Sequence, residues 1–291
     1  MLSVSDIKHR IKSVQDTRQI TKAMELISIS KMRKATKRYE SNLVYFQKVR
    51  QTIKDILTHS KDVHHPYMVH REGKRTAYVV IAGDKGMAGG YNKNVLERAW
   101  AHMQTRADYE KYVFTIGQKA REFFERRNVQ IDIDFLHATY DPKLADARRI
   151  TTDIVELYRK NLMDEVLVVF TKMKSPVSQS PMIIKLLPLD LHDLDDIYLD
   201  TEYSGEIAYD PSAKAVLDVL VPQYIIGLMY AMLVQSAACE HSARMLAMGT
   251  ANKNADEMLE TLNLDFNRAR QSAITTSINE ISAASILFQG E

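Results

Sequence analysis

The chain has 291 residues, of which 45% are hydrophobic, so it is long enough for one or two domains with a sizeable core. Its 39 basic and 37 acidic side chains nearly cancel, so overall charge gives no indication of a nucleic-acid partner. The single cysteine, Cys239, excludes an internal disulfide. The first residues lack the apolar core of a secretion signal, and Asp6 is atypical of a transit peptide. We therefore expect a cytoplasmic protein.

The first predicted element is a very long helix. Residues 5–58 contain neither Gly nor Pro, and apolar side chains recur at spacings of three and four, as in Ile20, Met24 and Ile27. Ser5 is the expected N-cap, and Lys8 three residues later excludes a capping box at that position. A helix of this length cannot bury its apolar stripe against a compact domain alone, so it needs an equally long partner.

Strand-like and helix-like segments alternate in the middle of the chain. Strands are predicted at residues 76–82, 112–116, 129–135, 165–171 and 182–187, and helices at 92–106, 118–127 and 143–161. This alternation favours a mostly parallel sheet in an α/β domain. The segment 191–210 is acidic and poorly periodic, which predicts a loop.

The partner helix is predicted at the other end of the chain, from residue 211 to about 288. Pro211 would be tolerated in its first turn, whereas Pro222 should kink or break it. Residues 219–239 carry no charge, which is compatible with a membrane span, but the proline, the glycine, the two glutamines and the serine within them favour a buried helix. The two terminal helices should pair as an antiparallel, left-handed coiled coil.

The predicted fold is therefore a long antiparallel coiled coil of N- and C-terminal helices with an inserted Rossmann-like α/β domain. Its parts are the N-terminal helix (1–60), the α/β domain (75–190), the loop (191–210) and the C-terminal helix (211–291). Such an arrangement is typical of a mechanical or docking part rather than of an ordinary soluble enzyme.

A glycine-rich segment at residues 83–90, the glycine turn, follows the first predicted strand, where nucleotide folds hold phosphates. Its spacing matches neither G-x-G-x-x-G nor the P-loop, so a tight connection with positive φ angles is favoured over a phosphate site. His59, His64, His65 and His70 lack regular ligand spacing, which favours a solvated loop over a zinc site. No nucleophile motif marks a catalytic site.

The first helix is basic, with thirteen Lys or Arg residues against five acidic ones between residues 5 and 58. The densest group, called here the basic cluster, consists of Lys31, Arg33, Lys34, Lys37 and Arg38. Such a helix binds nucleic acid, an acidic membrane or an acidic protein, or is simply solvated, and composition does not choose among these. The apolar end at residues 281–288 fits equally a hydrophobic socket on a partner and packing on the other helix.

Several motifs resemble those of one known family. They are residues 7–14 (IKHRIKSV), 21–32 (TKAMELISISKM), 83–92 (GDKGMAGGYN), 240–248 (EHSARMLAM) and 266–275 (FNRARQSAIT). Together they are similar to the gamma subunits of bacterial F-type ATP synthases. The match spans both ends of the chain and its first strand, while the middle matches only in pattern. Gly83 stands where many relatives have Ser, and Ser277 replaces a common carboxylate.

The resemblance implies a non-catalytic central rotor shaft that couples rotation of the membrane c ring to conformational changes in the catalytic beta subunits. It implies one copy per complex, peripheral at the cytoplasmic face of the membrane. Alpha, beta and epsilon subunits and the c ring are the implied partners. No cofactor, metal, nucleic acid or membrane span is expected.

By the same resemblance, particular residues would contact partners. Those facing the catalytic ring are Met24, Arg244, Arg270, Gln271, Thr275 and Glu280, and those meeting the c ring are Tyr209 and Asp210. The basic cluster would face acidic loops of the catalytic subunits, and the apolar end would sit in a hydrophobic bearing. Two rival functions remain, a nucleotide-binding enzyme using the glycine turn and a coiled-coil protein that binds nucleic acid through salt-sensitive contacts.

Overall fold

In a computed structural model of the chain, the helices and strands of the described residues follow one another in the order α1, β1, α2, β2, α3, β3, α4, β4, β5, α5. The structure describes residues 3–60, 65–189, 209–210 and 212–288, with side chains as far as residue 282. The chain divides into two units, one formed by Met1–Ile27 with Met245–Glu291 and the other by Ser28–Arg244. The long helices α1 (Val4–His59) and α5 (Ala213–Phe288) each contribute to both units.

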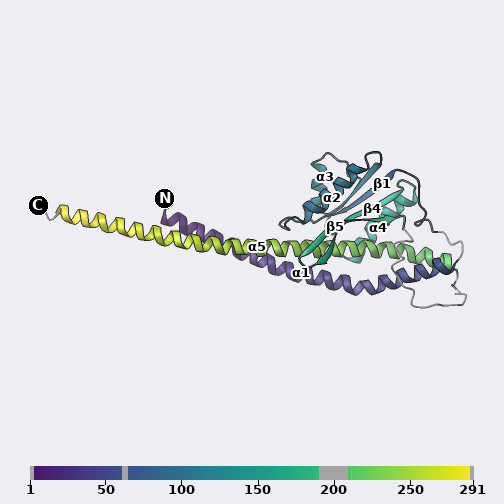
Figure 1. Cartoon of the computed structure of the whole chain (residues 1–291), viewed down its shortest axis with the longest axis horizontal. Coiled ribbons are helices and arrows are strands. Elements are labelled where there is room, and N and C mark those ends of the chain that lie inside the picture. The colour runs from purple at the N-terminus through teal and green to yellow at the C-terminus, as the bar shows by residue number, and fades with distance from the viewer. Residues whose placement is uncertain (1–2, 61–64, 190–208, 211, 289–291) are drawn as a thin grey trace. The chain divides into compact units, whose positions relative to one another are not determined.

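The unit Ser28–Arg244 contains a five-stranded sheet in the order β3-β2-β1-β4-β5 (Figure 1). Its strands are β1 (Arg75–Ile81), β2 (Glu110–Ile116), β3 (Ile133–Phe135), β4 (Glu165–Ser175) and β5 (Ser178–Leu187). The first four are parallel, and β5 returns antiparallel to β4 as a hairpin. The mostly parallel α/β fold is therefore confirmed.

Helices cover both faces of this sheet. On one face, α2 (Tyr91–Thr105) and α3 (Gln118–Glu125) pack on the β1 side chains Tyr78 and Val80. On the other, Val79 and Ile81 join a larger core with α4 (Leu144–Arg159), α1 and α5. Strand β1 is buried on both faces, which accounts for its unbroken apolar run.

The start of α1 differs from the prediction. Ser3, not Ser5, is the N-cap, because the Ser3 hydroxyl accepts the Asp6 N–H (3.1 Å) while the Asp6 carboxylate accepts the Ser3 N–H (3.2 Å). These reciprocal bonds form a capping box in which Asp takes the place usually held by Glu. The expected N-cap at Ser5 is therefore wrong by two residues, while no capping box at Ser5 itself was predicted.

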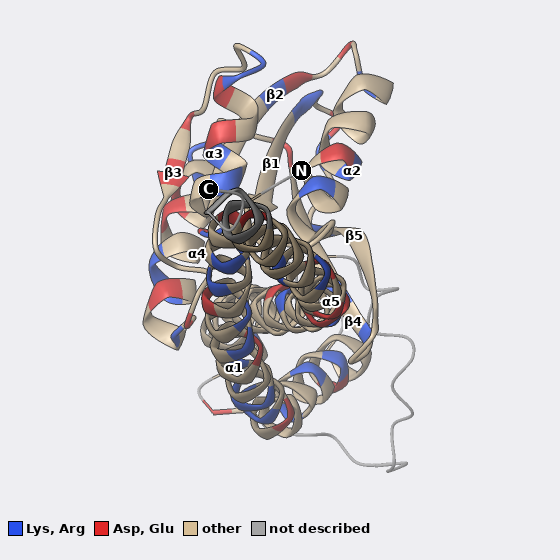
Figure 2. Ribbon diagram, turned by 90° about the vertical axis from the view of Figure 1, so that its left-hand side faces the viewer, with Lys and Arg blue, Asp and Glu red and all other residues tan. Residues whose placement is uncertain are grey.

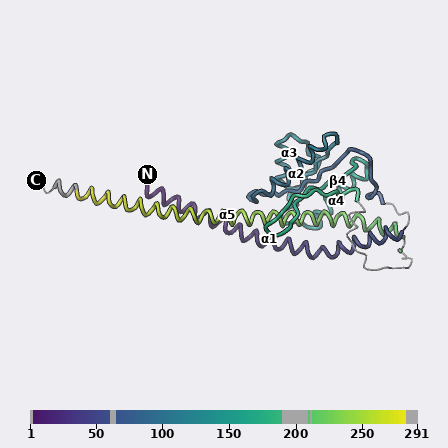
Figure 3. Tube along the Cα trace, viewed as in Figure 1, coloured from purple at the N-terminus to yellow at the C-terminus, as the bar shows by residue number. Residues whose placement is uncertain are grey.

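Pro222 lies inside the single helix α5, so of the expected kink or break the break is wrong. Figure 3 shows α5 as one unbroken coil. Its preceding residue Ser212 caps the helix by accepting the Ala215 N–H (3.2 Å), while Pro211 lies outside the described residues. Asp218, whose carbonyl group loses its helical donor to Pro222, is exposed, so water reaches this turn. Leu233 and Cys239 are fully buried and Met232 nearly so, which confirms the uncharged stretch as a core helix.

Four strands have other lengths than predicted, since β2 starts two residues earlier and β4 extends to Ser175. Strand β3 starts at Ile133 rather than residue 129, and just before it the Asp132 carboxylate, in place of a backbone carbonyl group, accepts the Val113 N–H (2.7 Å). Strand β5 starts at Ser178, earlier than predicted, because it pairs back along the whole of β4. The predicted loop 191–210 lies outside the described residues, except for 209 and 210.

In the unit formed by Met1–Ile27 and Met245–Glu291, α1 and α5 run antiparallel. Arg18 pairs with Asp256 (2.6 Å), and Thr21 and Glu25 both contact Asn252. In this register Ile7, which is buried, lies about one turn from the start of α1. Helix α5 runs on past that start, and its residues 271–282 are all exposed.

The predicted apolar stripe of α1 is only partly buried in this unit. Ile20 is 61% exposed and Ile27 is 54% exposed, whereas Met24 between them is half-buried. On α5, Leu262 is buried but Met258 is exposed. A single opposing helix covers a narrow stripe, so apolar residues off that stripe remain open to solvent.

Candidate assembly site: the glycine turn and the paired helices

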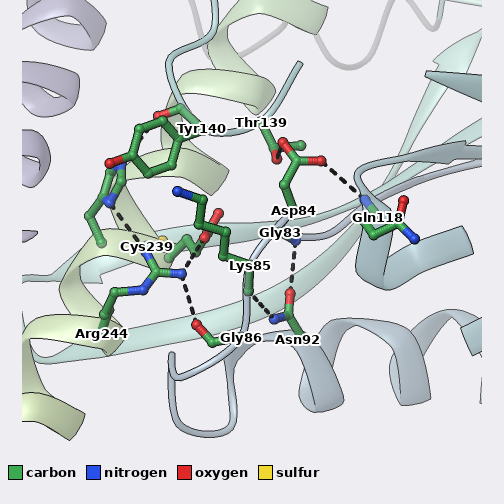
Figure 4. A network of polar contacts seen from close by, with 12 residues as sticks. Gly83, Asp84, Lys85, Gly86, Asn92, Gln118, Thr139, Tyr140, Cys239 and Arg244 are labelled. Carbon is green, nitrogen blue, oxygen red and sulfur yellow. Dashed lines mark hydrogen bonds and ion pairs between the residues drawn. The ribbon is translucent and has the colours of Figure 1, made fainter. Parts of the chain in front are cut away.

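The glycine turn is fixed by hydrogen bonds to the elements around it. The Gly83 N–H donates to the Asn92 side chain (2.8 Å), and the Asn92 amide donates to the Lys85 carbonyl group (3.2 Å). The Asp84 carboxylate accepts the Gln118 N–H (3.1 Å) and the Thr139 hydroxyl (2.9 Å), as Figure 4 shows. The predicted positive φ occurs at Gly89 (+52°). The turn is thus a braced connection between β1 and α2.

The space beside this turn suits a carboxylate of the chain itself. A Cβ atom at Gly83 would stand 2.8 Å from the Glu240 carboxyl carbon, closer than unbonded atoms approach. Glycine at position 83 therefore makes room for the α5 side chain Glu240, which is 1% exposed. An acidic group buried here repels phosphate, which argues against the rival nucleotide site.

Glu240 is held by Arg244 one helical turn along α5. The Arg244 guanidinium donates to the Glu240 carboxylate (2.5 Å) and to the Gly86 carbonyl group (3.1 Å). Burial raises the pKa of Glu240, and the hydrogen bond from Arg244 opposes that rise. Arg244 itself is only 5% exposed, so its guanidinium is used inside the chain.

The loop before α4 is held by both long helices. The Tyr140 carbonyl group accepts a hydrogen bond from His241 of α5 (3.2 Å), so that ring nitrogen must carry the proton. Lys31 of α1 and Lys85 of the glycine turn lie over the Tyr140 ring, 5.0 and 4.7 Å from its centre. Arg38 pairs with Asp141 (2.5 Å). Part of the basic cluster is thus engaged within the chain.

The rest of the basic cluster faces solvent. Arg33, Lys34 and Lys37 are exposed, and Figure 2 shows Lys and Arg recurring along α1. An exposed run of basic side chains of this kind is available to an acidic partner.

In the other unit, a polar layer joins the two helices. The Thr21 hydroxyl contacts the Asn252 side chain oxygen (2.5 Å), and the Asn252 amide donates to Glu25 (2.7 Å). Asn252 is buried, so these bonds satisfy polar atoms that would otherwise be costly in the seam.

The comparisons with known proteins agree with this arrangement. The family model described as ATP synthase matches residues 3–285. An ATP synthase gamma chain from Ruminiclostridium cellulolyticum is 43% identical over 288 residues, covering 96% of each chain. The chain belongs to the ATP synthase gamma chain family. A gamma chain from Alkaliphilus metalliredigens is 40% identical, again over 96% of each chain.

Solved structures of ATP synthases have the same fold. A chain of the Euglena gracilis mitochondrial ATP synthase, in a structure of its OSCP, F1 and c-ring parts, matches with a TM-score of 0.67. The match covers 98% of this chain and 94% of the other at 15% identity. The paired terminal helices with an inserted α/β sheet are therefore confirmed as the family fold.

The structure separates the residues that the family resemblance singled out. Arg270, Gln271, Thr275 and Glu280 are all exposed on the part of α5 that extends past α1, and Thr275 bonds only back to the Gln271 carbonyl group (2.9 Å) among the contacts described. Met24 is half-buried, and Arg244 is buried in the other unit. Their contacts with a catalytic ring stay predictions.

The two residues expected to meet the c ring, Tyr209 and Asp210, precede α5. Tyr209 packs partly against the large core, and burial raises the pKa of its hydroxyl. Asp210 is exposed. The contact of this pair with another subunit stays a prediction.

The histidine segment is less solvated than predicted. His65 is buried, stacks edge-on against Tyr67 (4.8 Å between ring centres) and faces Asp218 (3.6 Å). His64 lies outside the described residues. Over the described residues no group of three His, Cys, Asp or Glu side chains is placed to hold a metal.

Helix α5 is long and apolar enough to cross a membrane by length and composition, and it alone passes that test in the described part of the chain. Half of its most apolar window is buried inside the structure. A core helix passes the same test, and the buried residues 232–234 and 236–242 match that explanation.

Sequence reasoning missed Glu240 as a site residue. Its only signal was a lone acidic residue at the end of an uncharged helical stretch, four positions before Arg244, where one face of a helix brings the two together. The link to Gly83 was beyond the sequence, because it depends on how α5 crosses the sheet.

Proposed function

We propose that this chain is the central rotor shaft of an F-type ATP synthase. It couples rotation of a membrane c ring to conformational changes in catalytic beta subunits and is itself non-catalytic. The observation that carries the proposal is the bare C-terminal part of α5, which extends past its partner helix with its polar and apolar side chains exposed. Membership of the gamma chain family supports it.

The physical mechanism follows from asymmetry. One shaft surrounded by three catalytic subunits presents a different face to each of them. A subunit's conformational equilibrium shifts only by the difference in contact free energy between its states, so different faces favour different states. Rotation then moves each subunit through the states in turn. The exposed residues Arg270, Gln271, Thr275 and Glu280 are the proposed contacts at the end of the shaft.

The proposed partners are alpha and beta subunits of the catalytic head, an epsilon subunit and the c ring, with one copy of this chain per complex. The Euglena structure contains F1 and a c ring, which supports the head and the ring as partners. Tyr209 and Asp210 are the proposed c-ring contacts. The complex would hold this chain at the cytoplasmic face of a bacterial membrane, peripherally.

The test is reconstitution of ATPase activity from purified alpha and beta subunits, with and without this chain. The complex should form, and its turnover should depend on the chain and change when the chain is cut before Arg270. Arg270→Ala should alter turnover more than Arg268→Ala, a matched control because Arg268 is also exposed and lies on the same turn. A chain that never joins the complex would overturn the proposal.

A second assay addresses the c-ring contact. In vesicles that contain the complete synthase, Tyr209→Ala combined with Asp210→Ala should reduce ATP-driven ion pumping while ATP hydrolysis continues. Equal loss of both activities would place these residues in folding rather than in the contact, because Tyr209 also packs on the core.

A further inference from the structure

Glu240 joins helix α5 to the glycine turn from inside the unit Ser28–Arg244. Its carboxylate lies against Gly83, at the start of the turn, and accepts a hydrogen bond from Arg244. Arg244 in turn donates to Gly86, in the middle of the turn. Glu240 thus holds the turn in two ways, by filling the space beside Gly83 and by orienting the arginine that binds Gly86.

The position of Arg244 depends on this carboxylate. A buried guanidinium needs a partner charge, because removing one member of a buried ion pair leaves the other uncompensated. The other acidic group whose charge acts on this site is Asp84, and its oxygens are occupied by Gln118 and Thr139. Lys85 and Tyr91 also lie near Glu240, and neither carries a negative charge at neutral pH. His241 Nδ1 lies 3.5 Å from the Arg244 guanidinium, but this ring is uncharged at neutral pH because burial lowers its pKa to about 4, so it does not replace the carboxylate.

The turn also carries a projecting apolar side chain. Met87 has a φ of +58° and is 63% exposed, although the residues on both sides of the turn are tied to the sheet and to α5. A side chain held in this way keeps a fixed position on the unit only while the turn stays attached to α5.

We propose that Glu240 is a positioning residue that latches the glycine turn to α5. The α/β unit, here the sheet with α2, α3 and α4, and the part of α5 up to Arg244 then move as one body. This rests on the rotor function proposed above. Torque delivered to the α/β unit reaches the helix through its contacts with it, and a loosened turn lets part of each step be lost as internal motion. Glu240 touches no reacting group and acts through Arg244 and Gly83.

The first measurement is amide hydrogen exchange of the whole purified chain, read at peptides that cover residues 83–90. Glu240→Gln removes the charge at nearly constant volume and should speed exchange there about tenfold or more, because the hydrogen bond from Arg244 is stronger to a charged carboxylate than to a neutral amide. The matched control is Glu156→Gln, at an exposed carboxylate paired with Lys160. Exchange in β2 should be unchanged in both variants.

A second pair of variants keeps the test sharp if Glu240→Gln fails to fold. Gly83→Ala introduces the Cβ that would collide with the Glu240 carboxyl group, whereas Gly86→Ala places a Cβ in open space. Gly83→Ala should loosen the turn as Glu240→Gln does, and Gly86→Ala should leave it as in the unaltered chain.

The second measurement is the number of ions pumped per ATP hydrolysed by the complete synthase in vesicles. A structural defect alone lowers both activities together, so the ratio stays constant, whereas a lost latch lowers the ratio. The proposal is overturned if exchange at residues 83–90 is unchanged in both Glu240→Gln and Gly83→Ala, or if the turn loosens while the ratio equals that of Glu156→Gln. If the unaltered chain supports no pumping, the rotor function fails, and with it the latch's proposed role.

Discussion

The two glycines inside α5 should respond in opposite directions to the same substitution. A Cβ at Gly227 would stand 2.0 Å from Cε1 and 2.2 Å from Cδ1 of the Phe46 ring on α1. At Gly249 the nearest atom outside the helix is Glu25 Oε1, at 3.8 Å, an ordinary contact. Gly227 therefore lies where α1 and α5 approach closely and a larger side chain would collide. At Gly249 nothing outside the helix prevents a larger side chain.

The magnitudes follow from two opposing terms. Alanine in place of glycine favours a helix by about 1 kcal/mol. Overpacking against the Phe46 ring costs about 1–3 kcal/mol, with the lower end if the ring swings away. Gly249→Ala should thus stabilise α5 by up to about 1 kcal/mol, and Gly227→Ala should leave it unchanged or destabilise it by up to about 2 kcal/mol.

Hydrogen exchange along α5 measures both effects, since local opening free energies differ along a chain and a tenfold change in rate corresponds to about 1.4 kcal/mol. Exchange around residue 249 should slow up to about fivefold in Gly249→Ala, whereas exchange around 227 should stay unchanged or quicken in Gly227→Ala. Phe46→Leu should relieve the second effect. Equal slowing at both sites would refute the close approach of Phe46 to Gly227.

Two further predictions concern the capping box and pH. Ser3→Ala should destabilise the first turn of α1 by about 1 kcal/mol, seen as faster exchange confined to residues 4–8, with Ser5→Ala as a control that makes no difference. His241 should make stability rise with pH between about 4 and 6.5. Burial and, after it, the neighbouring charge of Arg244 lower the His241 pKa to about 4 in the folded chain, although the hydrogen bond to the Tyr140 carbonyl group acts to raise it. The unfolded chain therefore binds more protons than the folded chain over this pH range. The His241 contribution to stability, at most about 3 kcal/mol, is complete above pH 6.5. In urea unfolding measured at a series of pH values, His241→Gln should remove this rise of stability with pH. The raised pKa of Glu240 makes stability fall with pH, and that slope should remain in the variant.

The elements of this fold were largely readable from local patterns. The unbroken apolar run of β1 and the glycine-free stretch of α1 each have one physical explanation, so their predictions held. The start of β3 was not readable, because just before it the Asp132 side chain bonds the Val113 N–H on another strand. Local helical spacing also cannot tell how wide a stripe the partner covers, which is why Ile20 and Ile27 were expected to be buried and are exposed.

The site divides in the same way. Arg270, Gln271, Thr275 and Glu280 were named by resemblance, and their exposure is what a docking surface requires. Glu240 and Gly83 are 157 positions apart, from 240 − 83, and neither residue alone predicts the other. Their contact depends on the tertiary arrangement, which a single sequence does not specify.

The polar layer of Thr21, Glu25 and Asn252 sets the register between α1 and α5, and so the length of α5 that extends past α1. Sliding the two helices by one heptad would move one past the other by about 10 Å and would take Asn252 away from both Thr21 and Glu25, so both of its contacts across the pair would be lost. Apolar contacts alone tolerate such a slip, whereas a buried amide does not. The layer thereby fixes how many residues of α5 extend past the start of α1. It so determines the length of unpaired helix that a partner can contact.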